Sequence, residues 1–351
     1  MMGVLNHLST LLLLSLLPPA LSHVVKRFDP ECKKFFMEET TPNLPGILVD
    51  GPVQNQGQNQ NRYKPICQLF NNIYRFATLY DTTNRIPVFS AYTFTGPPTD
   101  PRPNQRWMIE PQLEDINNQR DMKVDNKAVT HQAVDTDYKL NKMKMDRGHL
   151  FPCSYAPDDD TKRSTFTLTN AVPQARSFNR GSWKTMECRV RKALLKDCIN
   201  NNGIKAYVVT GAVPSNNNNN NNNKLNDRVN IPSHLWTTYC CKNNLGQLVA
   251  GAHWAENVAE EKNEMKTVTP ITLNQLELKL KSVYELSEVK LFPKGCSTNV
   301  EQAGGKRTGE PIGELTNKKQ KSGEGSIKMK RAGELKECDE EDECDCDCDE
   351  K

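Results

Sequence analysis

The chain has 351 residues, with 46 Lys or Arg and 43 Asp or Glu, which gives a formal net charge of +3. This length allows one large domain or two small ones, but only 36% of the residues are hydrophobic, a low share that predicts an unpacked portion. No segment is apolar over the length needed to cross a bilayer, so we expect no membrane anchor.

The net charge averages two unlike regions of the chain. Residues 301–351 carry 10 basic and 15 acidic side chains, a net of −5, so the rest of the chain carries +8. A basic body favours a polyanionic partner such as nucleic acid. Because many basic domains bind no polyanion, the charge alone does not assign a function.

The first 22 residues resemble a secretory signal peptide. The stretch Leu8–Leu17 is almost entirely apolar, Pro18 and Pro19 end it, and Ala20-Leu-Ser22 follows with small residues at positions 20 and 22. The absence of Lys and Arg before the apolar stretch departs from the usual pattern. We expect residues 1–22 to be removed and the protein to be secreted.

The body of the chain shows alternating and helical hydrophobic patterns between residues 63 and 296, which predict one domain. Residues 23–62, with scattered Pro and a Gln/Asn run, are interpreted as a loose lead-in. The predicted elements are a hairpin of Phe76–Tyr80 with Ile86–Tyr92, a surface excursion over 95–145, a short strand over Phe166–Asn170, a helix over Trp183–Lys196, strands over Ala206–Thr210 and His234–Tyr239, and a helix then a strand over Ile271–Leu291.

Two segments lack the composition needed to build a core. The asparagine run at 216–223 is predicted to be a disordered loop insertion in the domain. Residues 297–351 are predicted to be a disordered tail with an acidic, cysteine-rich end.

Eight cysteines lie in the body, an even number that predicts disulfides in a secreted protein: Cys32, Cys67, Cys153, Cys188, Cys198, Cys240, Cys241 and Cys296. The spacing does not determine their connectivity, although the adjacent Cys240 and Cys241 are expected to pair with distant partners. A zinc site of Cys153, Cys188 and Cys198 is the alternative, and an oxidising compartment favours disulfides over it.

The chemically informative stretch runs from residue 146 to residue 187. It contains Asp146-Arg-Gly-His149, then Thr169-Asn-x-x-Pro-Gln174, then Asn179-x-x-x-Trp-x-x-x-Glu187. Phosphodiester cleavage needs a base for water, a cation and positive charge on the phosphate. His149 can be the base, Asn179 can offer a hard oxygen to a metal ion, and two arginines, Arg147 and Arg106, can hold the phosphate.

These three blocks, in this order, resemble the DNA/RNA non-specific endonuclease family of ββα-metal nucleases. The resemblance implies His149 as general base, Asn179 as metal ligand and Glu187 as the acid that orients metal-bound water. It also implies a second active-site asparagine at Asn170 and a phosphate-binding arginine at Arg106, which precedes Trp107.

The same resemblance implies a fold, a cofactor and a partner. The fold is α+β, a ββα-metal (His-Me finger) nuclease with a central antiparallel sheet, disulfide-stabilised here, with His149 on a strand and Asn179 leading into a helix. The cofactor is a divalent metal, Mg²⁺ first and Mn²⁺ second. The partner is the phosphate backbone of DNA and RNA, and no signal for an oligomeric state is present.

Each candidate residue has a purely structural alternative. Asn179 can cap the helix that follows, Glu187 can be an exposed helix acid, and Arg106 can be a solvated arginine. If Asn179 and Glu187 share one continuous helix, their Cα atoms are about 12 Å apart along its axis. We then expect Asn179 to touch the ion and Glu187 to act through water.

Three functions follow from these alternatives. The first is an active, secreted, metal-dependent endonuclease. The second is a nucleic-acid-binding protein that keeps the fold without turnover, against which the intact base, ligand and acid argue. The third is an extracellular interaction module in which the motif has no catalytic role.

Overall fold

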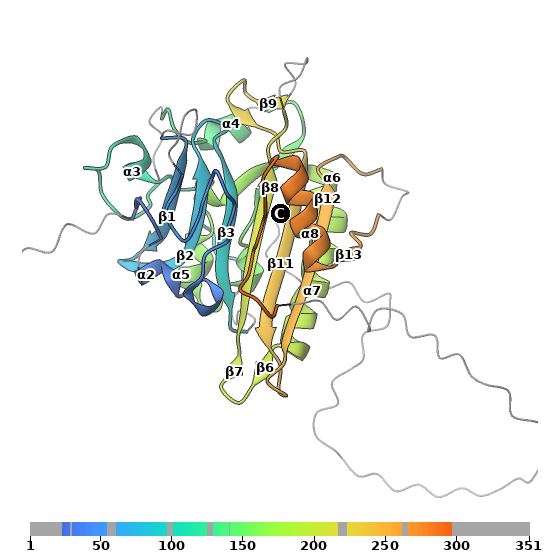
Figure 1. Ribbon diagram of the computed structural model, residues 1–351. Helices are drawn as coiled ribbons and strands as arrows, with labels where there is room; N and C mark the ends of the chain where they lie inside the picture. Colours follow the sequence, from blue (N-terminus) through green and yellow to red (C-terminus); the bar gives the residue numbers. More distant parts are fainter. Residues whose placement is uncertain are drawn as a thin grey trace, which may run out of the picture. The chain divides into compact units, whose positions relative to one another are not determined.

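A seven-stranded antiparallel sheet forms the centre of the computed structural model, in the order β1-β2-β3-β8-β11-β12-β13 (Figure 1). Its strands are β1 (Tyr63–Phe70), β2 (Ile73–Asp81), β3 (Ile86–Phe94), β8 (Ala206–Val213), β11 (His234–Lys242), β12 (Leu248–Glu256) and β13 (Pro270–Ile271). The α+β class with a central antiparallel sheet is therefore confirmed, as are the 76–92 hairpin and the strands at 206 and 234.

The structure describes residues 23–28, 30–54, 61–96, 101–124, 129–139, 141–216, 223–261 and 266–296. The expected signal peptide, most of the asparagine run and the expected tail lie outside these ranges. Among the described residues, no helix combines the length and apolar composition that a membrane crossing requires.

Side chains alternate between the two faces of the sheet, and each face has its own core. On β11, Leu235 and Tyr239 belong to one cluster of buried residues and Trp236 belongs to the other. On β8, Val208 and Val209 divide in the same way. This period of two is what an extended strand covered on both faces requires.

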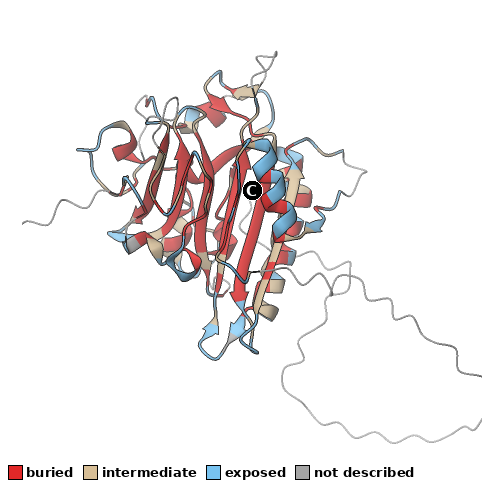
Figure 2. Ribbon diagram, viewed as in Figure 1, coloured by how far each residue is buried: buried red, intermediate tan, exposed pale blue. Residues whose placement is uncertain are grey.

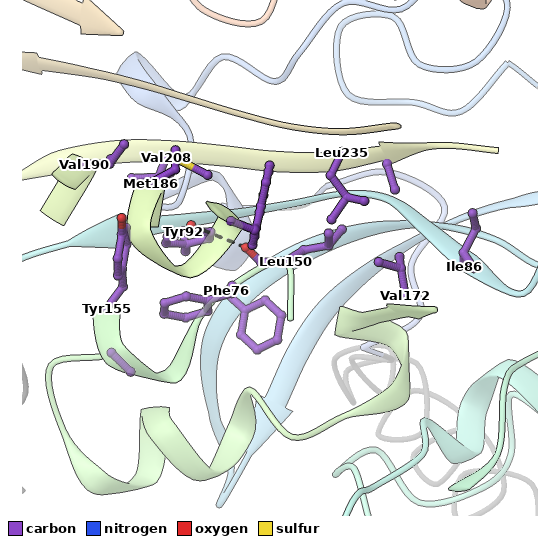
Figure 3. Packing of buried hydrophobic residues seen from close by; sticks show 14 of the residues in the cluster. Phe76, Ile86, Tyr92, Leu150, Tyr155, Val172, Met186, Val190, Val208 and Leu235 are labelled. Carbon is purple, nitrogen blue, oxygen red and sulfur yellow. Dashed lines mark hydrogen bonds between the residues drawn. The ribbon is translucent and has the colours of Figure 1, made fainter. Parts of the chain in front are cut away.

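The first face is covered by a ribbon of two short strands and the helix that follows it. These elements are β4 (Met145–His149), β5 (Ala171–Ala175), α6 (Arg176–Phe178), η5 (Asn179–Trp183) and α7 (Lys184–Asp197). Met186 and Val190 of α7 pack in one layer with Val208 and Tyr92 of the sheet (Figure 3). The helix predicted over Trp183–Lys196 is thus confirmed.

The second face is covered by α8 (Leu273–Val283) and by residues 28–48, which include α2 (Pro30–Lys33) and η1 (Met37–Glu39). Phe28, Phe36 and Leu48 are buried there, so residues 23–54 pack closely, in contrast to the loose lead-in expected from their composition. Figure 2 shows α8 with its outer side exposed above the buried strands. Thr272 and Gln275 close a capping box at its start.

Smaller elements connect these layers: α3 (Pro111–Glu114), α4 (Asp135–Lys139), η3 (Cys153–Tyr155), α5 (Asp159–Ser164), η4 (Leu168–Asn170), and the short ribbons β6 (Ile199–Asn200) with β7 (Gly203–Ile204) and β9 (Lys224–Leu225) with β10 (Val229–Asn230). Two expectations were wrong. Within residues 166–170, Thr167 makes an isolated bridge with Met108 and Leu168–Asn170 form a 3₁₀ turn before β5 instead of a strand. The segment after α8 makes an isolated bridge from Lys290 to Asn43.

Three disulfides join distant parts of the chain: Cys32–Cys67, Cys198–Cys241 and Cys240–Cys296. Because neighbouring strand residues face opposite sides, Cys241 reaches the end of α7 on the first face while Cys240 reaches the segment after α8 on the second. The expectation of distant partners for these two cysteines is confirmed. Cys188 is also disulfide-bonded, so neither it nor Cys198 is available for the zinc site considered above.

Candidate active site

The Asp146–His149 motif forms β4, which pairs with β5 in register from Met145 opposite Ala175 to His149 opposite Ala171. Burial alternates along β4: Asp146 and Gly148 are buried, whereas Arg147 and His149 are partly exposed. Arg147 and His149 therefore share one side of the ribbon, and both contact the ring of Trp107 on that side.

Gly148 is required by close packing against β5. A Cβ atom at this position would lie 2.0 Å from Oε1 and 2.7 Å from Cβ of Gln174. The glycine of the first motif and the glutamine of the second are thus two halves of one contact, which holds the strand that carries His149.

The His149 ring lies between two aromatic rings. Its centroid is 4.8 Å from that of Trp107 and 4.9 Å from that of Phe166. Burial, followed by the charges of Arg102 and Arg147, lowers the pKa of His149 to about 3. The imidazole is therefore neutral near pH 7, and its buried Nε2 makes no hydrogen bond to the described residues. A neutral imidazole can accept a proton there.

One of the two arginines expected at this site, Arg147, lies beside His149. Arg147 is held by Asp135, with Nη2 2.6 Å from Oδ1, and its guanidinium lies over Trp107 and Tyr138. Arg106 is exposed, and Arg102, which lies over the Phe166 ring, is the second charge besides Arg147 that acts on His149. Arg102 sits in a Pro-rich segment with no motif, so only the preference of Arg for aromatic faces could have indicated it.

Asn170 is fully buried and its amide is saturated by the protein. Oδ1 accepts hydrogen bonds from Ser90 Oγ and Phe151 N, at 2.9 and 3.0 Å. Nδ2 donates to the carbonyls of Phe151 and Thr165, at 3.1 and 3.0 Å. This side chain ties the segment after His149 to the sheet, and both its oxygen and its nitrogen are engaged by the protein.

Asn179 lies at the start of a π-helical turn between α6 and α7, a feature frequent at functional sites. Its own backbone is helical, which excludes the alternative of an N-cap. Nδ2 lies 3.4 Å from Asp146 Oδ2 and donates to it. An amide held in this way directs its oxygen away from the carboxylate, where the oxygen can serve as a metal ligand.

Asp146 is the anchor for this turn. Its side chain is only 4% exposed and accepts hydrogen bonds from Arg176 Nε at 2.9 Å and from Arg180 Nε at 2.7 Å. With both carboxylate oxygens engaged by arginines and Asn179, Asp146 acts as an organiser of the turn. No role for Arg176 or Arg180 was assigned from the sequence.

Glu187 lies on α7 one turn after Trp183, whose indole Nε1 donates to Glu187 Oε1 at 2.9 Å. The Trp183 and Glu187 positions of the third motif are thus in direct contact. Gly181 departs from helical geometry between Asn179 and Glu187. The two residues therefore do not share one continuous α-helix, and the separation of about 12 Å calculated for such a helix does not apply.

The donor set suits a weakly held hard cation. No group of three or more His, Cys, Asp or Glu that could hold a metal is found in the described ranges. Magnesium accepts one or two protein oxygens and keeps several waters, so a single amide oxygen at Asn179 fits it. A soft metal prefers thiolate or imidazole ligands to a single amide oxygen.

Comparisons with known proteins agree with the motifs. Residues 58–287 match the DNA/RNA non-specific endonuclease family. The chain is 31% identical over 256 residues to the Endonuclease domain-containing 1 protein of Homo sapiens, and 28% identical over 260 residues to that of Mus musculus. These alignments cover 70% of this chain and 45% and 44% of the relatives, so the chain spans less than half their length. A solved structure of the EndoG/EndoGI complex aligns with a TM-score of 0.44 and 19% identity, covering 60% of this chain and 81% of that one.

Proposed function

Because the chain belongs to the DNA/RNA non-specific endonuclease family, we propose that it is a metal-dependent endonuclease that hydrolyses DNA and RNA with low sequence specificity. The observation that carries the proposal is the buried Nε2 of His149, which has no hydrogen-bond partner in the described structure. A buried nitrogen without a hydrogen bond destabilises the folded protein unless a ligand or a water molecule hydrogen-bonds to it.

In the proposed reaction His149 is the general base and takes a proton from the attacking water. Asn179 Oδ1 would hold the metal ion, Mg²⁺ by preference, which when bound stabilises the charge that develops on the leaving oxygen. Glu187, fixed by Trp183, orients water at that site, and Arg147 and Arg102 attract the phosphate. Asn170 is a positioning residue that fixes the chain beyond His149.

We also propose that the protein is secreted. The three disulfides support this, since disulfides persist in oxidising compartments. Edman sequencing of protein recovered from the medium of expressing cells tests it, with His23 expected as the first residue. Retention of the whole protein inside the cells would contradict secretion.

Cleavage of plasmid DNA and of a long RNA by the purified, oxidised full chain tests the enzymatic proposal. Magnesium should support cleavage and a chelator should stop it. His149→Ala should lower the rate about a hundred- to ten-thousand-fold, the usual contribution of a general base. His131→Ala, at a half-exposed histidine outside this cluster, is the matched control and should retain the wild-type rate.

One observation favours a second candidate, a protein that binds nucleic acid without cutting it. Trp107 and Phe166 both contact the His149 ring and restrict its access. A wild-type chain that binds uncut DNA in a salt-dependent way, yet shows no metal-dependent cleavage, would establish this alternative.

A further inference from the structure

Arg176 and Arg180 form a pair of exposed guanidinium groups beside Asn179. Their side chains are 51% and 41% exposed, and both bind the carboxylate of Asp146. The two residues are four positions apart and separated from Asn179 by at most three positions. No part of the function proposed above uses them.

The two arginines share a single carboxylate. Two cations four positions apart on a helical segment repel each other, which normally destabilises the segment. Asp146 supplies one negative charge between them, so these three side chains together carry one positive charge at the surface. A positive charge at an exposed position attracts an approaching anion.

The carboxylate also fixes how the arginines are presented. Asp146 is almost fully buried and holds the Nε–H of each guanidinium, so both groups are oriented before any ligand arrives. An arginine presents its N–H groups as a planar fork that matches the oxygens of a phosphate. Arg176 in α6 and Arg180 in η5 place one such fork on each side of Asn179 in the chain.

We propose that Arg176 and Arg180 form a binding site for the phosphodiester groups that neighbour the cleaved phosphodiester group along the nucleic-acid strand. This inference rests on the proposed function, because it takes Asn179 as the residue nearest the cleaved phosphate. Phosphate contacts position a nucleic acid without reading its sequence, which fits low sequence specificity.

Binding of a fluorescent DNA duplex to the full chain in a chelator, measured over a range of salt concentrations, tests the site without cleavage. Arg176→Gln and Arg180→Gln should each weaken binding and reduce the slope of log K against log salt by about 0.9, the value for one lost phosphate contact on duplex DNA. Arg163→Gln is the matched control, since Arg163 is 36% exposed and ion-paired to Asp159 at 2.7 Å. It should keep the wild-type slope.

A measurement on the wild-type chain avoids any folding defect of the variants. Phenylglyoxal modifies accessible arginines, and mass spectrometry locates the adducts. Bound DNA should protect Arg176 and Arg180 while Arg163 stays reactive. Protection of none of the three, or unchanged salt slopes in both variants, would overturn the site.

The same experiments separate this inference from the proposed function. If the wild-type chain neither binds nor cleaves DNA, both the proposed function and the phosphate site are wrong. A wild-type chain that binds and cleaves, with unchanged slopes in the two arginine variants, removes only the phosphate site.

Discussion

Gln174 of β5 packs directly on the backbone of Gly148 of β4, so closely that no Cβ atom fits between them. The two residues belong to different sequence motifs and carry no chemistry of their own. Their contact keeps β4 and β5 together at the point where the chain presents His149. Gly148 and Gln174 are therefore present in their motifs because the two strands of the ribbon must pack closely.

Gly148→Ala should destabilise the fold by about 1–3 kcal/mol, the usual cost of overpacking a filled core. The Oε1 clash could be relieved by rotation of the Gln174 side chain, but Cβ of Gln174, at 2.7 Å, is fixed to the backbone. Urea denaturation measures the loss. Gln174→Gly in the same chain should restore part of the stability, and equal losses in both backgrounds would contradict the contact.

Asn170→Asp should destabilise the fold by about 3 kcal/mol or more, since it replaces two donors by acceptors and buries a charge. The amide nitrogen of Asn170 now donates to the carbonyls of Phe151 and Thr165. Ser90→Ala, which removes only one hydrogen bond to Asn170, should cost much less in the same urea titration. A stable Asn170→Asp variant would contradict this structural role and would favour a place for Asn170 in the substrate site.

The sequence predicted β2, β3, β8, β11 and α7 because their hydrophobic patterns follow the periods of a strand and a helix. It did not predict the sheet strands β1, β12 and β13. It failed for residues 23–54, where scattered prolines and the absence of a regular pattern hide the buried Phe28, Phe36 and Leu48. Those side chains are widely spaced and follow neither period. Only the second face of the sheet, assembled from distant segments, gives them a place to pack.

Stability should fall as the pH is lowered from about 6.5 towards 4. Burial lowers the pKa of His149 to about 3 and that of His253 to about 4. Below pH 6.5 the unfolded chain takes up protons at these histidines and the folded chain does not. The free energy of unfolding therefore decreases with falling pH, by up to about 1.4 kcal/mol per pH unit for each histidine.

Urea titrations between pH 7.5 and 4.5 measure this slope. His253→Gln should reduce the slope, because one of the two proton-uptake sites of the unfolded chain is gone. His131→Gln is the control, since that ring is half exposed, and it should leave the slope as in the wild type. A slope that does not respond to His253→Gln would count against the buried state of that ring.

Cys240→Ser and Cys241→Ser should each cost about 2–5 kcal/mol, the usual effect of removing a native disulfide. The two bridges close different loops on opposite faces of the sheet. Their losses should therefore add in the double variant, within about 0.5 kcal/mol. Thermal unfolding under oxidising conditions measures this, and a double variant no less stable than either single one would contradict the pairing.

The places of the proposed site residues in the fold were predictable only where a motif names the residue. His149 and Asn179 stand in motifs whose spacing is local, and β4 and η5 present them as that spacing suggests. Arg102 reaches His149 through a contact between segments far apart in the chain, with Phe166 as the bridge. No local pattern encodes such a contact, so the sequence indicated Arg106, next to Trp107, and gave no sign of Arg102.

Asn179 and Glu187 should respond differently to magnesium. Asn179 carries the proposed metal ligand, so Asn179→Ala should sharply raise the magnesium concentration needed for half-maximal cleavage. Asn179→Asp, which keeps an oxygen at this position, should need less magnesium than the alanine variant. Glu187 is held by the Trp183 indole, and Glu187→Gln keeps an acceptor for that hydrogen bond. It should therefore lower the maximal rate more than it changes the magnesium requirement.

A magnesium titration of plasmid cleavage for each variant separates these effects, because binding appears in the midpoint and turnover in the plateau. Asn179 and Glu187 are divided by the departure at Gly181, and Asp146 orients only the first of them. Two different environments should give two different curves. If Glu187→Gln moves the midpoint as far as Asn179→Ala does, the carboxylate must itself be a ligand of the ion. The division of roles proposed for these two residues would then be wrong.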